Sequence, residues 1–94
     1  MTHEEKLRFI LNHYGLRKQM TKLFEELGEV SIEISRFMLG RGSKFNIGAE
    51  IADVLVMLRQ IAIALDLEEY INKQIEFKLD RQIDRINGEG KDEH

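Results

Sequence analysis

The chain has 94 residues, a net charge of -3, and neither cysteine nor proline. This length allows one domain, and the lack of cysteine excludes a disulfide framework and a thiolate metal site. Acidic and basic residues are mixed along the chain, which argues against the basic stripe that nucleic-acid-binding proteins present.

The N-terminal segment THEEKLRFILNHYG predicts a first helix over residues 3–14. Thr2 and Glu5 form a capping-box pattern, in which each side chain accepts a backbone N–H of the other residue, and Gly15 offers a stop. The segment is charged and has no apolar signal-peptide core, so we expect a soluble cytoplasmic protein.

A long run of apolar residues at helical spacing predicts a second helix over residues 16–39. The apolar side chains recur at steps of three and four, which is typical of a helix with one buried face. Gly40 and Gly42 follow and are expected to end the helix, and Asn46 is placed to cap the next one.

The most apolar segment of the chain predicts a third helix over residues 47–65. Apolar side chains surround this helix on nearly all sides, so it is expected to be the buried central one. Glu50, Asp53 and Arg59 interrupt the apolar run, which argues against a membrane span of about 20 apolar residues.

Asp66 followed by Glu69 marks the start of a fourth helix, which is predicted over residues 67–87. Residues 88–94, GEGKDEH, are expected to form a flexible polar tail. The sequence therefore predicts a single all-α domain over residues 1–87, built as a four-helix bundle with short loops.

Two pairs of acids lie beside the expected apolar faces. At about 100° per residue, Glu26 and Glu29 flank the apolar stripe of the second helix, whereas Glu25 points further round. Glu50 and Asp53 repeat the three-residue spacing on the third helix, where an unpaired carboxylate in an apolar setting is costly. If these two helices pack antiparallel, four carboxylates surround one small volume, and a divalent cation is its natural occupant.

The competing interpretation is that these acids pair with basic side chains or face water. It is favoured for the acids of the second helix taken alone, and weaker for Glu50 and Asp53, whose helix has one base, Arg59. If a cation is present, oxygen ligands favour Mg²⁺, Mn²⁺ or Ca²⁺. No histidine lies three residues after a glutamate, so the Glu-x-x-His pairs of ferritin-like di-iron proteins are absent. Because protein-bound magnesium usually shares its coordination sphere with phosphates, a phosphate-bearing substrate is a further hypothesis.

The two acidic segments, EELGE and EIAD, carry a resemblance to a known family. Together they resemble the E-E-x-x-E … E-x-x-D signature of the MazG-like, all-α nucleoside triphosphate pyrophosphatases. The segments HYGLRKQMTKLFEELGEV, EIADVLVMLRQI and EFKLDRQIDRI are similar to the family's helices around and after this signature. The resemblance covers the chain from about Leu11 to Ile86.

The resemblance implies a Mg²⁺-dependent enzyme, with Mn²⁺ as a possible substitute. Such enzymes hydrolyse nucleoside triphosphates between the α- and β-phosphates, giving a monophosphate and pyrophosphate, and they work as dimers or dimers of dimers. The ligands carried over by motif position are Glu26, Glu29, Glu50 and Asp53.

The remaining site residues are assigned by a mechanistic hypothesis that joins the residue chemistry to the resemblance. Glu25 or Glu29 orients or deprotonates the attacking water. Basic side chains neutralise phosphate charge, and a glutamine contacts the nucleotide. These substrate-binding candidates are Gln19, Lys78 and Arg81, with Lys22 and Lys44 as weaker ones. For each base, an ordinary ion pair on the helix surface is an equally good explanation.

Some apolar positions exceed what four helices of one chain can cover. Ile32 and Leu39 lie opposite the main stripe of the second helix, and Val56 and Ile63 add a further face on the third. These positions predict a homodimer or a homotetramer. The alternative function is a non-catalytic helical dimer that binds a nucleotide, a metal or a protein partner. The base and sugar preference stays open.

Overall fold

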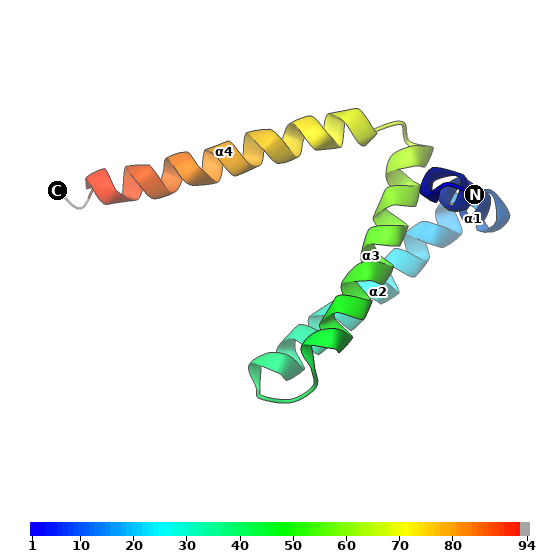
Figure 1. The fold of residues 1–94 in the computed structure, drawn as a ribbon, viewed down its shortest axis with the longest axis horizontal. Coiled ribbons are helices and arrows are strands. Elements are labelled where there is room, and N and C mark those ends of the chain that lie inside the picture. The colour runs from blue at the N-terminus through cyan, green and yellow to red at the C-terminus, as the bar shows by residue number, and fades with distance from the viewer. Residues whose placement is uncertain (93–94) are drawn as a thin grey trace.

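The computed structural model describes the backbone of residues 1–92 and the side chains of residues 1–89. Within this range the chain forms four α-helices and no strand, which confirms the predicted all-α class (Figure 1). The helices are α1 (His3–Tyr14), α2 (Leu16–Met38), α3 (Lys44–Ala64) and α4 (Glu68–Asp92). In this described part, no helix is both long and apolar enough to cross a bilayer.

The predicted capping box at the start of α1 is confirmed. The Thr2 hydroxyl accepts the Glu5 N–H at 3.1 Å, and the Glu5 carboxylate accepts the Thr2 N–H at 3.1 Å. Gly15 ends the helix at a φ of 88°, a conformation that favours glycine, and its N–H bonds the Leu11 carbonyl at 2.8 Å.

A Schellman motif closes α2, as the glycine after it predicts. Gly40 adopts a φ of 77° and donates to the Phe37 carbonyl at 3.0 Å, while the N–H of Arg41 bonds the Arg36 carbonyl at 2.8 Å. The chain therefore reverses direction within a few residues, and α3 returns alongside α2 (Figure 1).

The start of α3 lies three residues before the predicted one, and its cap is not Asn46. Ser43 has an extended backbone, and its hydroxyl accepts the N–H of Asn46 at 3.2 Å. Asn46 therefore sits inside the first turn. Serine is as good a cap as asparagine, and here it stands one turn earlier, so the helix begins at Lys44.

Both ends of α4 also differ from the prediction. Asp66 does not start the helix; it adopts a φ of 54° and closes α3, and the N–H of the next residue, Leu67, bonds the Ala62 carbonyl at 2.9 Å. The helix continues to Asp92 rather than ending near residue 87, so residues 88–92 of the expected polar tail are helical. Glycine costs a helix only about 1 kcal/mol and no proline blocks it, which allows this extension. The last two residues lie outside the described part.

A buried pair of amides fixes the register of α2 against α3. The Gln19 side chain donates to the Gln60 side-chain oxygen at 2.8 Å, and the two residues are 3% and 0% exposed. The Gln60 amide also donates to the carbonyl of Val56 at 3.2 Å. In an antiparallel pair, each residue further along α2 from Gln19 is matched by one residue back along α3 from Gln60. Seven such residues lead to Glu26 opposite Asp53, and ten lead to Glu29 opposite Glu50.

One chain buries little apolar surface. Among the described residues, the buried apolar side chains are Leu7, Val54 and Ile63. The radius of gyration is 17.4 Å, whereas a compact chain of this length has about 12 Å. The reason is α4, which meets α3 only near their junction and then projects away from the other helices (Figure 1). A single chain therefore leaves one side of the expected bundle open.

We expect the Gln19–Gln60 bond to contribute measurably to stability. Gln60→Ala leaves a buried amide without its acceptor and opens a cavity, so the free energy of unfolding should fall by about 2 kcal/mol or more. Replacing both glutamines with methionine removes both polar groups and should cost less than Gln60→Ala alone. Urea denaturation at one fixed protein concentration measures both effects. Equal losses in the two variants would contradict the bond.

Candidate metal centre

The predicted meeting of acids from α2 and α3 takes place at the middle of the helix pair. One carboxylate oxygen each from Glu26, Glu50 and Asp53 lies within 4.8 Å of the others. Glu26 and Glu50 are partly buried, and Asp53 is exposed. The three residues are called the acidic cluster below. Their oxygens are close enough to share one cation.

The electrostatics of the acidic cluster are unfavourable without a cation. Partial burial raises the pKa of Glu50, and the negative charges of Asp53, Glu26, Glu29 and Glu33 raise it further. Each of these causes penalises the ionised carboxylate, and the positive charge of a bound cation would offset that penalty.

Glu33 is an acid that the sequence analysis did not include in the site. One of its carboxylate oxygens is buried and has no hydrogen-bond partner among the described residues. The same oxygen lies 3.6 Å from the position that a Cβ on Gly42 would occupy, so the glycine of the turn leaves room beside it. A buried acceptor without a donor is costly. The all-oxygen donor set of the acidic cluster fits a hard divalent cation. Glu33 is not part of the cluster, because about 10 Å of helix separates it from Glu26.

Glu29, the fourth predicted ligand, is exposed and is not part of the three-residue cluster. Its charge nevertheless contributes to the raised pKa of Glu50. Glu25, predicted to handle water, has a side chain that is 64% exposed.

Lys22 lies at the edge of the acidic cluster. Its ammonium nitrogen is 3.2 Å from a carboxylate oxygen of Glu25 and 3.5 Å from one of Glu26. These neighbours raise the pKa of Lys22, chiefly through the hydrogen bond and the charge of Glu25. The lysine thus stays protonated and places one positive charge beside the acids.

The other predicted substrate-binding residues are not brought to the cluster. Gln19 is buried against Gln60, and about 10 Å of helix separates it from Glu26. Lys78 and Arg81 belong to α4, which projects away from α2 (Figure 1). The Arg81 guanidinium instead lies over the ring of Phe77, 5.7 Å from its centroid.

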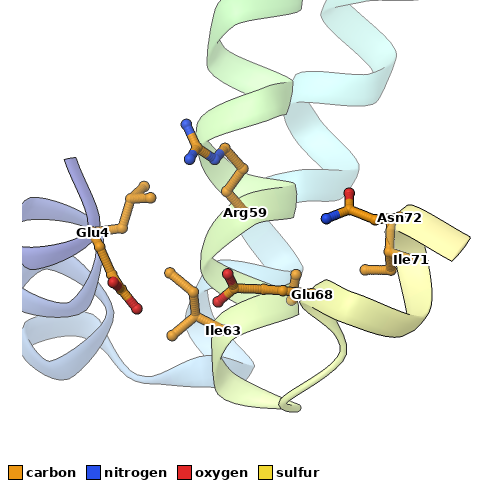
Figure 2. A pocket seen from close by; sticks show the side chains of 8 residues that line it. Glu4, Arg59, Ile63, Glu68, Ile71 and Asn72 are labelled. Carbon is orange, nitrogen blue, oxygen red and sulfur yellow. The ribbon is translucent and has the colours of Figure 1, made fainter.

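The described part of the chain also has cavities away from the acidic cluster, including the following two. The first, of about 280 Å³, is bounded by α1, α3 and α4 (Figure 2). Its polar lining includes Arg59, Glu68 and Asn72, which come from α3 and α4. The second, of about 390 Å³, is a mostly apolar groove between α1 and α3. None of the residues predicted for the site lines either cavity, so the acidic cluster remains the candidate site.

A scan against protein-family models, a search of curated proteins and a search of solved structures each found no match to this chain. The assignment of a function therefore depends on the residues and their geometry.

The raised pKa of Glu50 predicts how stability varies with pH in the metal-free protein. Because the pKa is higher in the folded chain than its ordinary value of 4.5, the ionised carboxylate destabilises the fold. Stability should therefore rise as the pH falls through the folded pKa towards 4.5. Glu50→Gln removes the charge, so this variant should melt at a higher temperature than the parent at pH 7 without metal, and the difference should shrink in acid.

The control for this experiment is Glu76→Gln, which removes an exposed acid of α4 far from the cluster. Thermal melts followed by circular dichroism in the presence of a chelator provide the measurement. A Glu50→Gln variant that melts below the parent at pH 7 would contradict the proposed electrostatic strain.

Proposed function

We propose that the protein is a Mg²⁺-dependent nucleoside triphosphate pyrophosphohydrolase, which converts (d)NTP to (d)NMP and pyrophosphate. The observation that carries the proposal is the convergence of Glu26, Glu50 and Asp53, from the two acidic segments, on one small volume. This convergence is what the resemblance to the MazG-like pyrophosphatases leads one to expect. The raised pKa of Glu50 adds support, because it reflects first the partial burial of the carboxyl group and then the negative charges of the neighbouring acids.

The residues that would hold Mg²⁺, or Mn²⁺ in its place, are the three of the acidic cluster, with Glu29 as the proposed fourth ligand. All are carboxylates, which suit hard cations. When bound, the metal supplies positive charge for the triphosphate oxygens and lowers the pKa of a coordinated water.

The chain's own residues have distinct proposed roles around the reacting phosphate. Glu29 is exposed and opposite Glu50, so its carboxylate is well placed to accept a proton from the attacking water. Glu25 is the second candidate for this role. In this structure its carboxylate forms an ion pair with Lys22 at 3.2 Å. Lys22 offers positive charge to the phosphates. A nucleotide contact by Gln19 would require it to leave its bond to Gln60.

The assembly that we propose is a homodimer or a homotetramer, in the cytoplasm. The positions expected to be surplus are largely unburied: Ile32, Leu39 and Val56 are exposed, although Ile63 is buried within the chain. Large apolar residues such as Phe24 and Leu27 add to the exposed surface of α2. The exposure of these large apolar residues on two helices supports the proposed assembly.

The same exposed surface also suits the alternative function, a non-catalytic helical dimer that binds a nucleotide, a metal or a protein partner. The two functions use the same acids and differ in turnover. Incubation of the pure protein with a panel of NTPs and dNTPs plus Mg²⁺, with assays for monophosphate and pyrophosphate, separates them.

We expect Asp53→Asn and Glu50→Gln to reduce pyrophosphate release by about 100-fold or more, because each removes a charge from the proposed centre. EDTA should abolish the activity, and added Mg²⁺ should restore it. Glu76→Gln is the matched control and should keep the parent rate. A folded Asp53→Asn protein with the parent rate would refute the site assignment.

A further inference from the structure

The apolar groove between α1 and α3 has a basic rim. Each helix contributes one stripe to the lining, at positions i, i+3, i+4 and i+7. The apolar residues of the lining are Leu7, Ile10, Ala52, Leu55 and Val56. The other lining residues are His3, Lys6 and Arg59. Every polar side chain that lines the groove is therefore basic.

The bases of the rim are not neutralised by the acids near them. In the described part of the chain, neither Lys6 nor Arg59 forms an ion pair. Glu4 is paired instead with Arg8 at 2.9 Å, and the other acid in the first turn of α1 is held in the capping box. Figure 2 shows the guanidinium of Arg59 turned away from the carboxylates of Glu4 and Glu68. The groove thus combines an apolar floor with two uncompensated positive charges and an imidazole.

The size of the groove suits a small ligand better than a helix of a partner protein. Its volume of about 390 Å³ lies within the range of small-molecule sites, which is about 300–1,000 Å³. The lining spans residues 3–10 of α1 and residues 52–59 of α3, or about 10 Å of each helix. An isolated helix needs about 12–15 residues to form in water, so much of a docked helix would extend beyond the groove.

The chemistry of the lining indicates a ligand with one apolar chain and one anionic head. Each methylene that the floor removes from water increases the affinity about fourfold. A guanidinium and an ammonium at the rim favour a carboxylate, because it can accept hydrogen bonds from both. A doubly charged phosphate would lose more hydration on entering a mostly apolar groove. An extended alkyl chain advances about 1.3 Å per carbon, so about 10 Å of groove holds a chain of about eight carbons.

We propose that the α1–α3 groove binds a medium-chain monocarboxylate, with the alkyl chain along the apolar floor and the carboxylate against Lys6 and Arg59. The site is separate from the acidic cluster, and it does not depend on the proposed pyrophosphohydrolase activity. Val56 lines the groove and also belongs to the proposed assembly. A second copy of the chain is therefore the competing occupant.

A titration with octanoate followed by NMR tests the site directly. In protein labelled at the methyl groups of leucine, isoleucine and valine, octanoate below its micelle-forming concentration should shift the signals of Leu7, Ile10, Leu55 and Val56. Hexanoate has two methylenes fewer and should bind about 15-fold less tightly. 1-Octanol has the chain without the charge and should bind about tenfold less tightly or worse. Equal binding of octanol, or no shift of the four residues, would overturn the proposal.

Variants of the rim and of the floor show whether octanoate occupies the groove. Arg59→Gln and Lys6→Gln should each weaken its binding by about tenfold or more, because each removes a charged hydrogen-bond donor. Ala52→Phe fills the floor and should abolish binding. Lys18→Gln, the matched control, removes an exposed base of α2 that does not line the groove, and it should keep the parent affinity. Circular dichroism checks that each variant is folded, and a folded Ala52→Phe protein with the parent affinity would place octanoate elsewhere and refute the site.

The dependence on protein concentration distinguishes octanoate from a second copy. Sedimentation of the free protein shows where chains associate, and NMR over the same range shows which methyl signals respond. We expect the signals of the groove to respond to octanoate and to stay in place on association. Signals that shift on association and do not change further with octanoate would assign the groove to a second copy and overturn the proposal.

Discussion

The buried hydrogen bond between Gln19 and Gln60 is the contact on which the arrangement of the site depends. It joins α2 to α3 at the end of the pair furthest from the turn, where both amides are withdrawn from water. A pair of helices held only by apolar side chains can slide or rotate at small cost, whereas a buried amide pair loses its partner when the register changes. The bond therefore fixes which residues of α2 and α3 face each other along the rest of their length.

The turn fixes the other end of the pair. Gly40 supplies the left-handed residue that closes α2, and Ser43 caps α3 three residues later. Between these two constraints the acids have little freedom to separate, even though their charges repel. Glu33 illustrates the cost, because one of its oxygens is buried without a donor among the described residues. The fold thus holds negative charges together against their own repulsion, which is what a binding site for a cation requires.

Much of this could be predicted from the sequence, because the signals are local. Helical spacing gave four helices, and the glycines and the pair Thr2 and Glu5 marked most of the ends. The three-residue spacing of Glu50 and Asp53 led to the acidic cluster once an antiparallel arrangement was assumed. The predicted cap of α3 was wrong, because Ser43 and Asn46 both have a side-chain oxygen that can accept a backbone N–H at the start of a helix.

The long-range features were beyond the reach of these signals. Gln19 was predicted to contact the nucleotide, and only its contact with a residue 41 positions away showed that it is buried against α3. Glu33 was not assigned to the site, and its own helix does not indicate that one of its oxygens is buried without a donor among the described residues. The turn before α4 also contains Asp66 in a left-handed backbone conformation, which is uncommon for a residue other than glycine.

The small number of buried apolar side chains has a consequence for the life of the chain in a cell. In the proposed assembly, association would supply much of the free energy of folding, because the buried apolar residues of the described part are Leu7, Val54 and Ile63. Stability then follows the law of mass action, and it rises with the amount of protein synthesised. A freshly made chain that has not yet met a partner would be open to proteases. The cell would then remove unassembled chains and keep those in the proposed assembly.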